Sequence, residues 1–280
     1  MVNRHFNRKA SERLRIKQVG GHDTHVIEAD NPRSLALLAR AYKEVYEAAF
    51  PIAGERETLE AWQNSLHDKN KATNIVIVVA GDHLDAPDPT LKAISVAYYY
   101  KQTDAGLMAY NAVAPAFQGQ GLGRTMVDAR KSALHDLAYS YGKPLGGIFI
   151  ECHDPAKVTS EEDVMDPALR IKMFEKMGAI TLPVDYVEPP FEEGGRKSEN
   201  FKLLAYAHPG TGKYPTKAEI KDYLTGIYAA LARFAKCAPE DNADYLKSVG
   251  QLDKLDLDAF YKTVLAERKK QTPKPPAQKP

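Results

Sequence analysis

The sequence predicts an α/β protein in which one mixed β-sheet carries helices on its faces. Short β-branched runs, such as Ile75 to Val79, alternate with longer segments whose apolar residues recur every three or four positions. Clusters of Gly, Asp and Pro separate these segments and predict turns. The resulting order is β, α, α, β, β, β, α, β, α, β, and an order of this kind packs helices against a sheet.

The composition is that of an ordinary globular protein of 280 residues, with 44% apolar and 27% charged residues. The 38 basic residues balance 37 acidic ones, so no overall field attracts nucleic acid or acidic lipid. Cys152 and Cys237 stand far apart, which predicts neither a disulfide framework nor a zinc site. No segment is apolar enough for a secretion signal or a membrane span. We therefore expect a cytoplasmic protein that binds no metal, no nucleic acid and no membrane.

The sheet and its helices are expected to fill residues 24–208, after a polar segment over 1–23. Asn31 and Pro32 predict the start of the first helix, with the capping residue ahead of a proline. Strands are expected over 24–29, 75–79, 91–100, 107–113, 147–151 and 200–207, and helices over 32–49, 57–66, 119–137 and 168–177.

From residue 215 onward the pattern is helical only. Apolar stripes run from Ile220 to Phe234 and from Phe260 to Leu265, and uncovered they would form a patch larger than monomers usually expose. The short linker at 209–214 favours packing of the helical extension, residues 215–270, on its own domain, although a homodimer stays open. Residues 271–280 are rich in Pro and Lys, which predicts disorder.

A glycine-rich segment joins the strand that ends at Val113 to the following helix, with Gly119, Gly121 and Gly123 at alternate positions. The first turn of a helix leaves backbone N–H groups unpaired and carries about half a positive charge. Glycines let phosphate oxygens approach that backbone closely. The segment therefore predicts a phosphate-binding loop, and a glycine-rich loop without a ligand is the alternative.

This segment resembles the signature of the GNAT N-acetyltransferase superfamily. The family's hallmark [RQ]-x-x-G-x-[GA] is met by residues 118–123, which read QGQGLG. The family's Val-x-Pro on the preceding strand is met by Val113-Ala114-Pro115. The order of elements over residues 24–207 is also the family's. The resemblance implies a GNAT-like acyl-CoA N-acyltransferase fold, here followed by a C-terminal helical extension.

The resemblance further implies a reaction in which acetyl-CoA gives its acetyl group directly to a primary amine. Backbone amides of the loop would hold the coenzyme pyrophosphate. The strand before the loop would pair with the pantetheine arm, and one amide would polarise the thioester carbonyl. The residues implied for the coenzyme are Ala112, Val113, Ala114, Gln118, Gly119, Gln120, Gly121, Leu122, Gly123, Arg124 and Thr125.

A second landmark of the family departs from its usual form. The family's helix ending Tyr-Glu-Lys-Leu-Gly-Phe carries a tyrosine near the departing thiolate, and Phe174 stands in its place. A phenylalanine has no proton to give, so the acid comes from elsewhere, water serves, or catalysis is lost. Tyr186 is a candidate substitute, with an aromatic packed on the sheet as the alternative.

The glutamate that accepts the proton of the amine in many family members is also missing from its usual position. No glutamate stands between Leu107 and Val113, where those members keep it. Glu151, at the end of the next strand, is the nearest candidate, followed by His153. The alternatives are an edge ion pair for Glu151 and a loop position for His153.

The turn between the first two helices would roof the acceptor pocket in the family. Its residues Glu55, Arg56 and Glu57 are candidate contacts for a cationic or zwitterionic acceptor, or a solvated helix start. Two other functions stay open, namely an acyl-CoA-binding module without turnover and an N-acyltransferase that uses a longer acyl-CoA.

Overall fold

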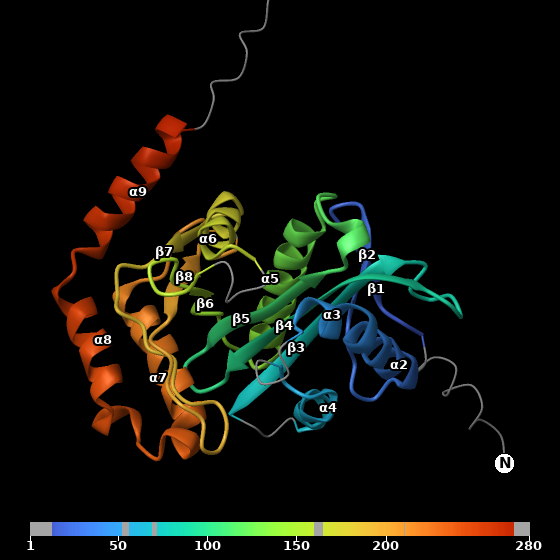
Figure 1. The fold of residues 1–280 in the computed structure, drawn as a ribbon, viewed down its shortest axis with the longest axis horizontal. Coiled ribbons are helices and arrows are strands. Elements are labelled where there is room, and N and C mark those ends of the chain that lie inside the picture. Colours follow the sequence, from blue (N-terminus) through green and yellow to red (C-terminus); the bar gives the residue numbers. More distant parts are fainter. Residues whose placement is uncertain (1–12, 52–55, 69–71, 160–164, 210, 272–280) are drawn as a thin grey trace, which may run out of the picture.

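The structure, a computed structural model, describes residues 13–51, 56–68, 72–159, 165–209 and 211–271. Its centre is one eight-stranded sheet with the order β1-β2-β3-β4-β5-β6-β8-β7 (Figure 1). The strands are β1 (Ile16–Val19), β2 (His22–Val26), β3 (Thr73–Asp82), β4 (Thr90–Tyr100), β5 (Ala105–Val113), β6 (Gly147–His153), β7 (Ala179–Thr181) and β8 (Phe201–Tyr206).

Helices cover both faces of this sheet (Figure 1). The α-helices are α2 (Pro32–Ala41), α3 (Glu47–Ala49), α4 (Leu59–His67), α5 (Leu122–Ser140), α6 (Pro167–Lys176), α7 (Lys217–Ala235), α8 (Ala243–Lys254) and α9 (Leu257–Gln271). A π-helix η1 (Tyr42–Tyr46) joins α2 to α3, and the 3-10 turns are η3 (Pro115–Phe117) and η4 (Pro239–Asp241). No helix in the described ranges is both long and apolar enough to cross a membrane. The mixed α/β fold class predicted by the sequence is confirmed.

The sheet is antiparallel except where β5 runs parallel to β6. These two strands pair only from Ala105↔Gly147 to Leu107↔Phe149, and they diverge beyond that point. On its other side, β5 stays paired with β4 as far as Val113, with a bulge at Ala109. The divergence leaves the second half of β5 without β6 as a neighbour, and this opening lies directly before the glycine loop.

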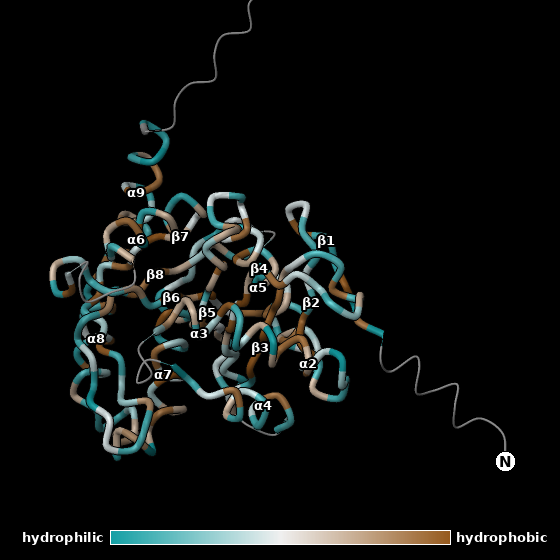
Figure 2. Tube along the Cα trace, turned by 45° about the vertical axis from the view of Figure 1, so that its right-hand side comes forward, coloured by the Kyte–Doolittle hydropathy of each residue, from teal (hydrophilic) through white to brown (hydrophobic). Residues whose placement is uncertain are grey.

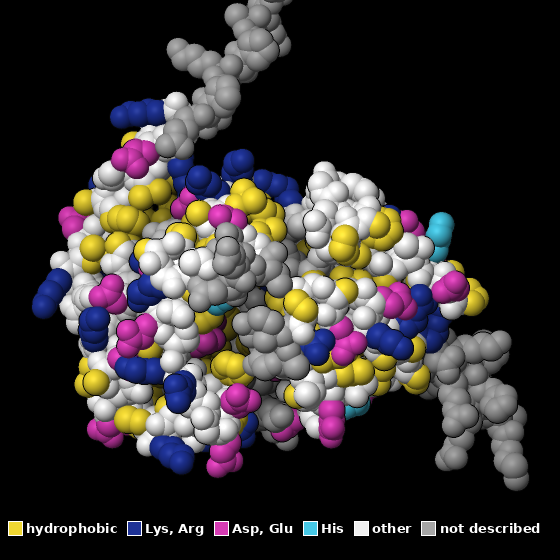
Figure 3. Space-filling view, viewed as in Figure 1, with side chains coloured by type: hydrophobic (Ala, Val, Ile, Leu, Met, Phe, Trp, Pro, Cys, Tyr) yellow, Lys and Arg dark blue, Asp and Glu magenta, His cyan; other side chains and the backbone are white. Residues whose placement is uncertain are grey.

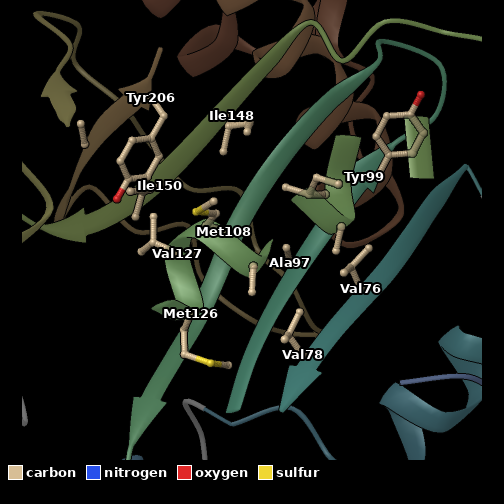
Figure 4. Packing of buried hydrophobic residues seen from close by; sticks show 14 of the residues in the cluster. Val76, Val78, Ala97, Tyr99, Met108, Met126, Val127, Ile148, Ile150 and Tyr206 are labelled. Atoms are coloured by element: carbon tan, nitrogen blue, oxygen red, sulfur yellow. The ribbon is translucent and has the colours of Figure 1, made fainter. Parts of the chain in front are cut away.

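One face of the sheet packs against α5, with α6 beside it. The buried cluster between sheet and helix includes Val78, Met108, Met126 and Ile150, all at most 2% exposed (Figure 4). β3 and β4 are buried along nearly their whole length because helices cover both of their faces. These strands form a rigid base on which both ends of β5 are fixed.

The other face carries two separate groups of helices (Figure 1). The N-terminal group, α2, η1 and α4, buries Tyr46 and Trp62 completely over β3 and β4. The C-terminal group, α7 and α8, packs over β5, β6 and β8. Tyr98 on β4 contacts both groups. The middle of the sheet therefore lies between two helical walls.

The stripe predicted from Ile220 to Phe234 packs on the chain's own sheet through α7. Five of its residues are at most 2% exposed: Ile220, Tyr223, Leu224, Ile227 and Tyr228. In contrast, α9 projects from the body with mixed hydropathy along its length (Figure 2). Leu265 on α9 is 38% exposed. The stripe near the C-terminus is thus covered only in part, where Phe260 and Tyr261 pack on the helices of the C-terminal group.

The sheet begins earlier than the expected boundary at residue 24. Residues 16–19 form β1 and pair with β2 through a turn at Gly20 and Gly21, whose φ values are 57° and 83°. A Gly-Gly pair between two short runs is a hairpin signal, but the run IKQV is too polar to read as a strand by itself. β7 was also not predicted, because a three-residue edge strand carries no periodic pattern.

Candidate functional site

The glycine loop turns the chain from the end of β5 into α5. After the 3-10 turn η3, Gly119 has a φ of 75°, and Gly121 has a φ of 83° at the N-cap of α5. Such backbone conformations are strained for residues with a side chain. The glycines at these two positions are therefore required by the turn itself.

Unpaired donors and open space meet at this loop. The N–H groups of Arg124 and Thr125 donate to the oxygen of Gly121, at 3.0 and 3.1 Å. Within the described part of the chain, the N–H groups of Leu122 and Gly123 have no acceptor. A Cβ atom built on Gly119, Gly121 or Gly123 would meet no atom within 4 Å. The start of α5 therefore offers free donors beside a space that the protein does not fill, as an anion site requires.

Side chains at the loop fix its geometry. The Gln118 amide donates to the oxygen of Val113 at 3.2 Å, and the Arg124 guanidinium donates to the oxygen of Lys176 at 2.9 Å. The second contact joins the loop to the end of α6. Figure 3 shows Lys and Arg side chains gathered along the upper edge of this face, around α6 and toward the loop. A basic edge of this kind suits a ligand with several phosphates.

Not every residue implied for the coenzyme faces the open space. The side chains of Leu122 and Thr125 are at most 3% exposed, and Thr125 lies under the turn at Gly20. The Ala114 N–H donates to the oxygen of Lys92 at 2.9 Å, and the Thr125 N–H is already paired within the helix. The free amides of Leu122 and Gly123 and the unpaired edge of β5 are the groups that stay available.

A mixed sheet with one short parallel pair, which diverges where a glycine loop opens the next helix, completes the pattern that the hallmark implied. The chain has a GNAT-like fold. No protein-family model matches the sequence, and no curated protein matches it either.

Solved structures that are similar to this chain include several acetyltransferases. A protein of Bacteroides thetaiotaomicron assigned to the GNAT family is 18% identical, with 76% of this chain and 98% of that one covered, at a TM-score of 0.46. The ribosomal-protein-S18-alanine N-acetyltransferase of Escherichia coli is 12% identical, with 65% of this chain and 92% of that one covered, at a TM-score of 0.38. A GNAT family acetyltransferase of Elizabethkingia anophelis, solved with acetyl-CoA bound, is 13% identical. The match covers 59% of this chain and 88% of that one, at a TM-score of 0.36. Likenesses of this size identify no acceptor.

The structure brings two of the predicted catalytic residues into direct contact. The hydroxyl of Tyr186 donates to Oε1 of Glu151 on β6, and the hydroxyl of Tyr223 on α7 donates to the same oxygen at 2.9 Å. Burial raises the pKa of the Glu151 carboxyl, and the two donated hydrogen bonds offset part of that rise. Glu151 is therefore a desolvated carboxyl group held by two tyrosine hydroxyls, and the alternative of an edge ion pair does not describe it.

Tyr186 and His153 occupy different surroundings. Tyr186 is only 2% exposed, and burial raises the pKa of its hydroxyl well above the usual value. Its proton is committed to Glu151, so it is poorly placed as an acid for a thiolate. The His153 ring lies against Phe201, with ring centroids 4.6 Å apart. Phe174, at the family's tyrosine position, packs half-buried on the α5 side of the sheet.

The three residues predicted to contact the acceptor have different surroundings in the structure. Glu55 lies outside the described residues. Arg56 pairs with Glu47 at 3.6 Å. Glu57 accepts a hydrogen bond from the hydroxyl of Tyr98 on β4, and burial raises the pKa of its carboxyl. Glu57 therefore faces the middle of the sheet, and the description as a solvated helix start fails for it.

A third carboxyl, which sequence reasoning missed, joins this region. Glu188 lies in the segment between β7 and β8, where its backbone bridges Ser198 with bonds of 2.8 and 2.9 Å. Burial, and next the charge of Glu151, raise the pKa of Glu188 to about 8. We call these residues the tyrosine–carboxylate cluster; its members are Glu57, Glu151, Glu188, Tyr98, Tyr100, Tyr110, Tyr186 and Tyr223.

The cluster lies between the two helical groups and is built from both. Glu57 comes from the N-terminal group, Tyr223 from the C-terminal group, and Tyr98, Tyr100 and Tyr110 from the sheet between them. Among the described residues, no three acidic, His or Cys side chains are grouped to hold a metal ion.

Proposed function

We propose that this chain transfers an acetyl group directly from acetyl-CoA to a primary amine. The observation that carries the proposal is the glycine loop, where free N–H groups of Leu122 and Gly123 face open space beside the unpaired edge of β5. The pyrophosphate would bind at the start of α5, and the pantetheine arm would lie along β5 as an added strand.

The proton chemistry is assigned to the other side of the opening. The amine nitrogen attacks the thioester carbonyl carbon, the carbon–sulfur bond breaks, and the coenzyme leaves as a thiolate that water protonates. The nitrogen loses its extra proton to Glu151, whose raised pKa makes its carboxylate a stronger base than an exposed glutamate. Tyr186 and Tyr223 hold Glu151 in place. His153, two residues along the same strand, is the alternative base.

A module that binds acyl-CoA without turnover is the second candidate. Phe174 favours it, because the position that supplies the acid in the family cannot give a proton. The substitution is compatible with catalysis, since a thiol with a pKa near 8.5 leaves as a thiolate with only modest need of an acid at neutral pH. An N-acyltransferase for a longer acyl-CoA is a variant of the first proposal that differs in the acyl pocket.

The experiment that tests the proposal follows release of free thiol from acetyl-CoA with a panel of amines. Turnover with any acceptor supports transfer and excludes the module without turnover. Coenzyme binding by calorimetry without turnover across the panel would favour that module, and failure to bind coenzyme at all would overturn both.

A further inference from the structure

Strand β5 contains a bulge just beyond its last pair with β6. Tyr110 pairs with Val96 of β4. The next pair joins Met108 to Ala97, so Ala109 is an extra residue in the register of the two strands. Ala109 and Tyr110 are consecutive, yet both pack on the face of the sheet that carries the two helical groups. Because side chains of a regular strand alternate between faces, the bulge decides which face each later residue of β5 occupies.

Arg130 on α5 binds the backbone of this bulge. Its Nη1 donates to the carbonyl oxygen of Tyr110 at 2.9 Å and to that of Val96 at 3.3 Å. These oxygens belong to the two strands that pair at the bulge, and one donor serves both. A bulge disrupts the ladder of backbone hydrogen bonds, and buried carbonyl groups need partners. The guanidinium therefore replaces bonds that the bulge removes from the sheet.

The position is unfavourable for a cation that only fills space. Arg130 is 1% exposed, and among the described residues its Nε and Nη2 groups have no hydrogen-bond partner. Burial lowers the pKa of the guanidinium to about 10, so the group still carries its charge at neutral pH. A buried charge with unpartnered donors costs free energy, and an apolar side chain would fill the same volume at lower cost. The two bonds to the bulge are what an arginine adds at this position.

Arg130 also connects the two parts of the proposed coenzyme site. Helix α5 runs without interruption from Leu122 to Ser140, so the residue that holds the bulge is joined rigidly to the helix start, where the pyrophosphate would bind. The part of β5 beyond the bulge is the edge along which the pantetheine arm would lie. Pyrophosphate and arm belong to one ligand, so the distance between their binding sites has to match that ligand.

We propose that Arg130 is a positioning residue, which fixes the bulged part of β5 relative to the start of α5 so that one coenzyme molecule contacts both. The inference rests on the proposed acetyl transfer and adds a residue that does not touch the substrate. Without the guanidinium, the carbonyls of Val96 and Tyr110 lose their common donor, and β5 leaves the bulged arrangement or fluctuates around it. The glycine loop keeps its conformation, because its turns depend on Gly119 and Gly121.

The test uses the full chain and two ligands that differ in the pantetheine arm. Coenzyme A carries the arm and the pyrophosphate, whereas adenosine 3′-phosphate 5′-diphosphate carries the pyrophosphate without the arm. Arg130→Met keeps a long side chain but removes every donor. In calorimetry we expect this variant to bind coenzyme A about tenfold or more weakly than the wild type, because the arm no longer fits its strand. Its affinity for the nucleotide should stay within about twofold of the wild-type value.

Two further variants connect this difference to the bonds at the bulge. Arg130→Lys retains an ammonium group that can donate to the same carbonyls, so it should restore part of the affinity for coenzyme A. Lys131→Met is the matched control, because it removes a cation from the next position of α5, where the ammonium lies 3.5 Å from the centroid of the Tyr206 ring. It should leave the ratio of the two affinities unchanged. If Arg130→Met does not fold, Arg130→Lys should still weaken coenzyme A binding more than nucleotide binding. Equal weakening of both ligands, or of neither, in a folded Arg130 variant would overturn the inference.

Hydrogen exchange without any ligand separates this inference from the proposed function. In Arg130→Met, backbone amides of β4 and β5 around the bulge should exchange about tenfold faster, whereas those of β6 and β8 should keep their wild-type rates. Faster exchange at the bulge, combined with a wild-type protein that binds neither ligand, would support the hold of Arg130 on β5 and overturn the proposed function. Unchanged exchange, combined with coenzyme A binding like that of the wild type, would overturn the inference and leave acetyl transfer intact.

Discussion

The two sides of the opening between β5 and β6 are built by different means. The proposed coenzyme side is one continuous segment, from Val113 to Arg124, and it offers backbone N–H groups. The proposed acceptor side is the tyrosine–carboxylate cluster, which consists of side chains from both helical groups and the sheet. A ligand common to many enzymes meets backbone, whereas the ligand that differs between enzymes meets side chains. If the proposed function holds, specificity would reside on the side that depends on the whole fold.

The largest effect should come from deleting the chain after residue 213, which removes one wall of the acceptor side. Five residues of α7 are fully buried, and each contributes about 1.5–3 kcal/mol by burial. Their sum is comparable to the whole stability of a domain, about 5–15 kcal/mol. We expect aggregation or a strongly lowered melting temperature, measured by calorimetry and light scattering. A truncated protein as heat-stable as the full chain would show that α7 only adjoins the sheet.

Gly123→Glu should weaken coenzyme binding without affecting the acceptor side. The fold has space for the new side chain, and φ at Gly123 lies outside the left-handed region, unlike φ at Gly121. A carboxylate there would repel the pyrophosphate, so we expect coenzyme affinity to fall by at least ~100-fold, about 2.7 kcal/mol, in calorimetry. Gly250→Glu, in α8 and also in open space, is the control. Unchanged affinity in Gly123→Glu would place the pyrophosphate elsewhere.

Glu151→Gln should separate chemistry from coenzyme binding. Glutamine keeps an oxygen for Tyr186 and Tyr223 but does not accept the proton of the amine. We expect turnover to fall by roughly 100-fold, the lower range for a positioned acid–base group, with unchanged coenzyme affinity. Rates are measured by thiol release, with Glu240→Gln as control. A rate and pH profile like those of the wild type would assign the base to His153 or to water.

Tyr223→Phe tests whether the C-terminal extension acts on the site through its hydroxyl. The variant keeps the ring that stacks on Phe149 at 4.3 Å but removes one of two hydrogen bonds to Glu151. We expect a loss of about 1 kcal/mol of stability, a several-fold lower turnover and a shifted pH profile. Tyr139→Phe, at a tyrosine that is 77% exposed, should change none of these. An unaltered pH profile for Tyr223→Phe would limit α7 to a packing role.

A further prediction concerns the pH dependence of stability through Glu188. Its folded pKa of about 8 lies above the unfolded value near 4.3, so the folded state holds the proton more tightly. The stability from the neutral carboxyl is complete below pH 4.3 and is lost as the pH rises through 8. The glutamine in Glu188→Gln stays neutral at every pH. The melting temperature of this variant should therefore rise relative to that of the wild type as the pH increases from 5 to 9. A difference that does not vary with pH would contradict this.

The same contrast explains how much the sequence predicts. The loop could be recognised because its conformation depends on glycine spacing and a helix start, both of which are local. The run of apolar residues from 147 also placed Glu151 on β6, although the strand continues past it to His153. Tyr223 could not be assigned, because in sequence it is one member of an apolar stripe. Glu188 carries no local signal either, since only the packing of its segment on α7 and α8 buries it.

A sharper sequence signal existed for the sheet residues of the cluster. The run Tyr98-Tyr99-Tyr100 alternates across β4, so Tyr98 and Tyr100 face the cluster whereas Tyr99 faces α5 and donates to Asp104 at 2.6 Å. Two tyrosines two residues apart on one face of a strand could have indicated the acceptor surface. The unexpected strand β1 shows the opposite limit, because a polar edge strand becomes recognisable only with its partner.

The hydrogen bonds to Glu151 also set an order of events during synthesis. Tyr186 and Tyr223 follow Glu151 by 35 and 72 residues, and domains are made from the N-terminus onward. The segment that would grip the donor is therefore finished long before the ribosome adds the last partner of Glu151. A growing chain passes through a stage in which the donor half exists without its acceptor half. We expect closure of α7 onto the sheet to be a late folding event, because contacts this far apart in sequence form slowly.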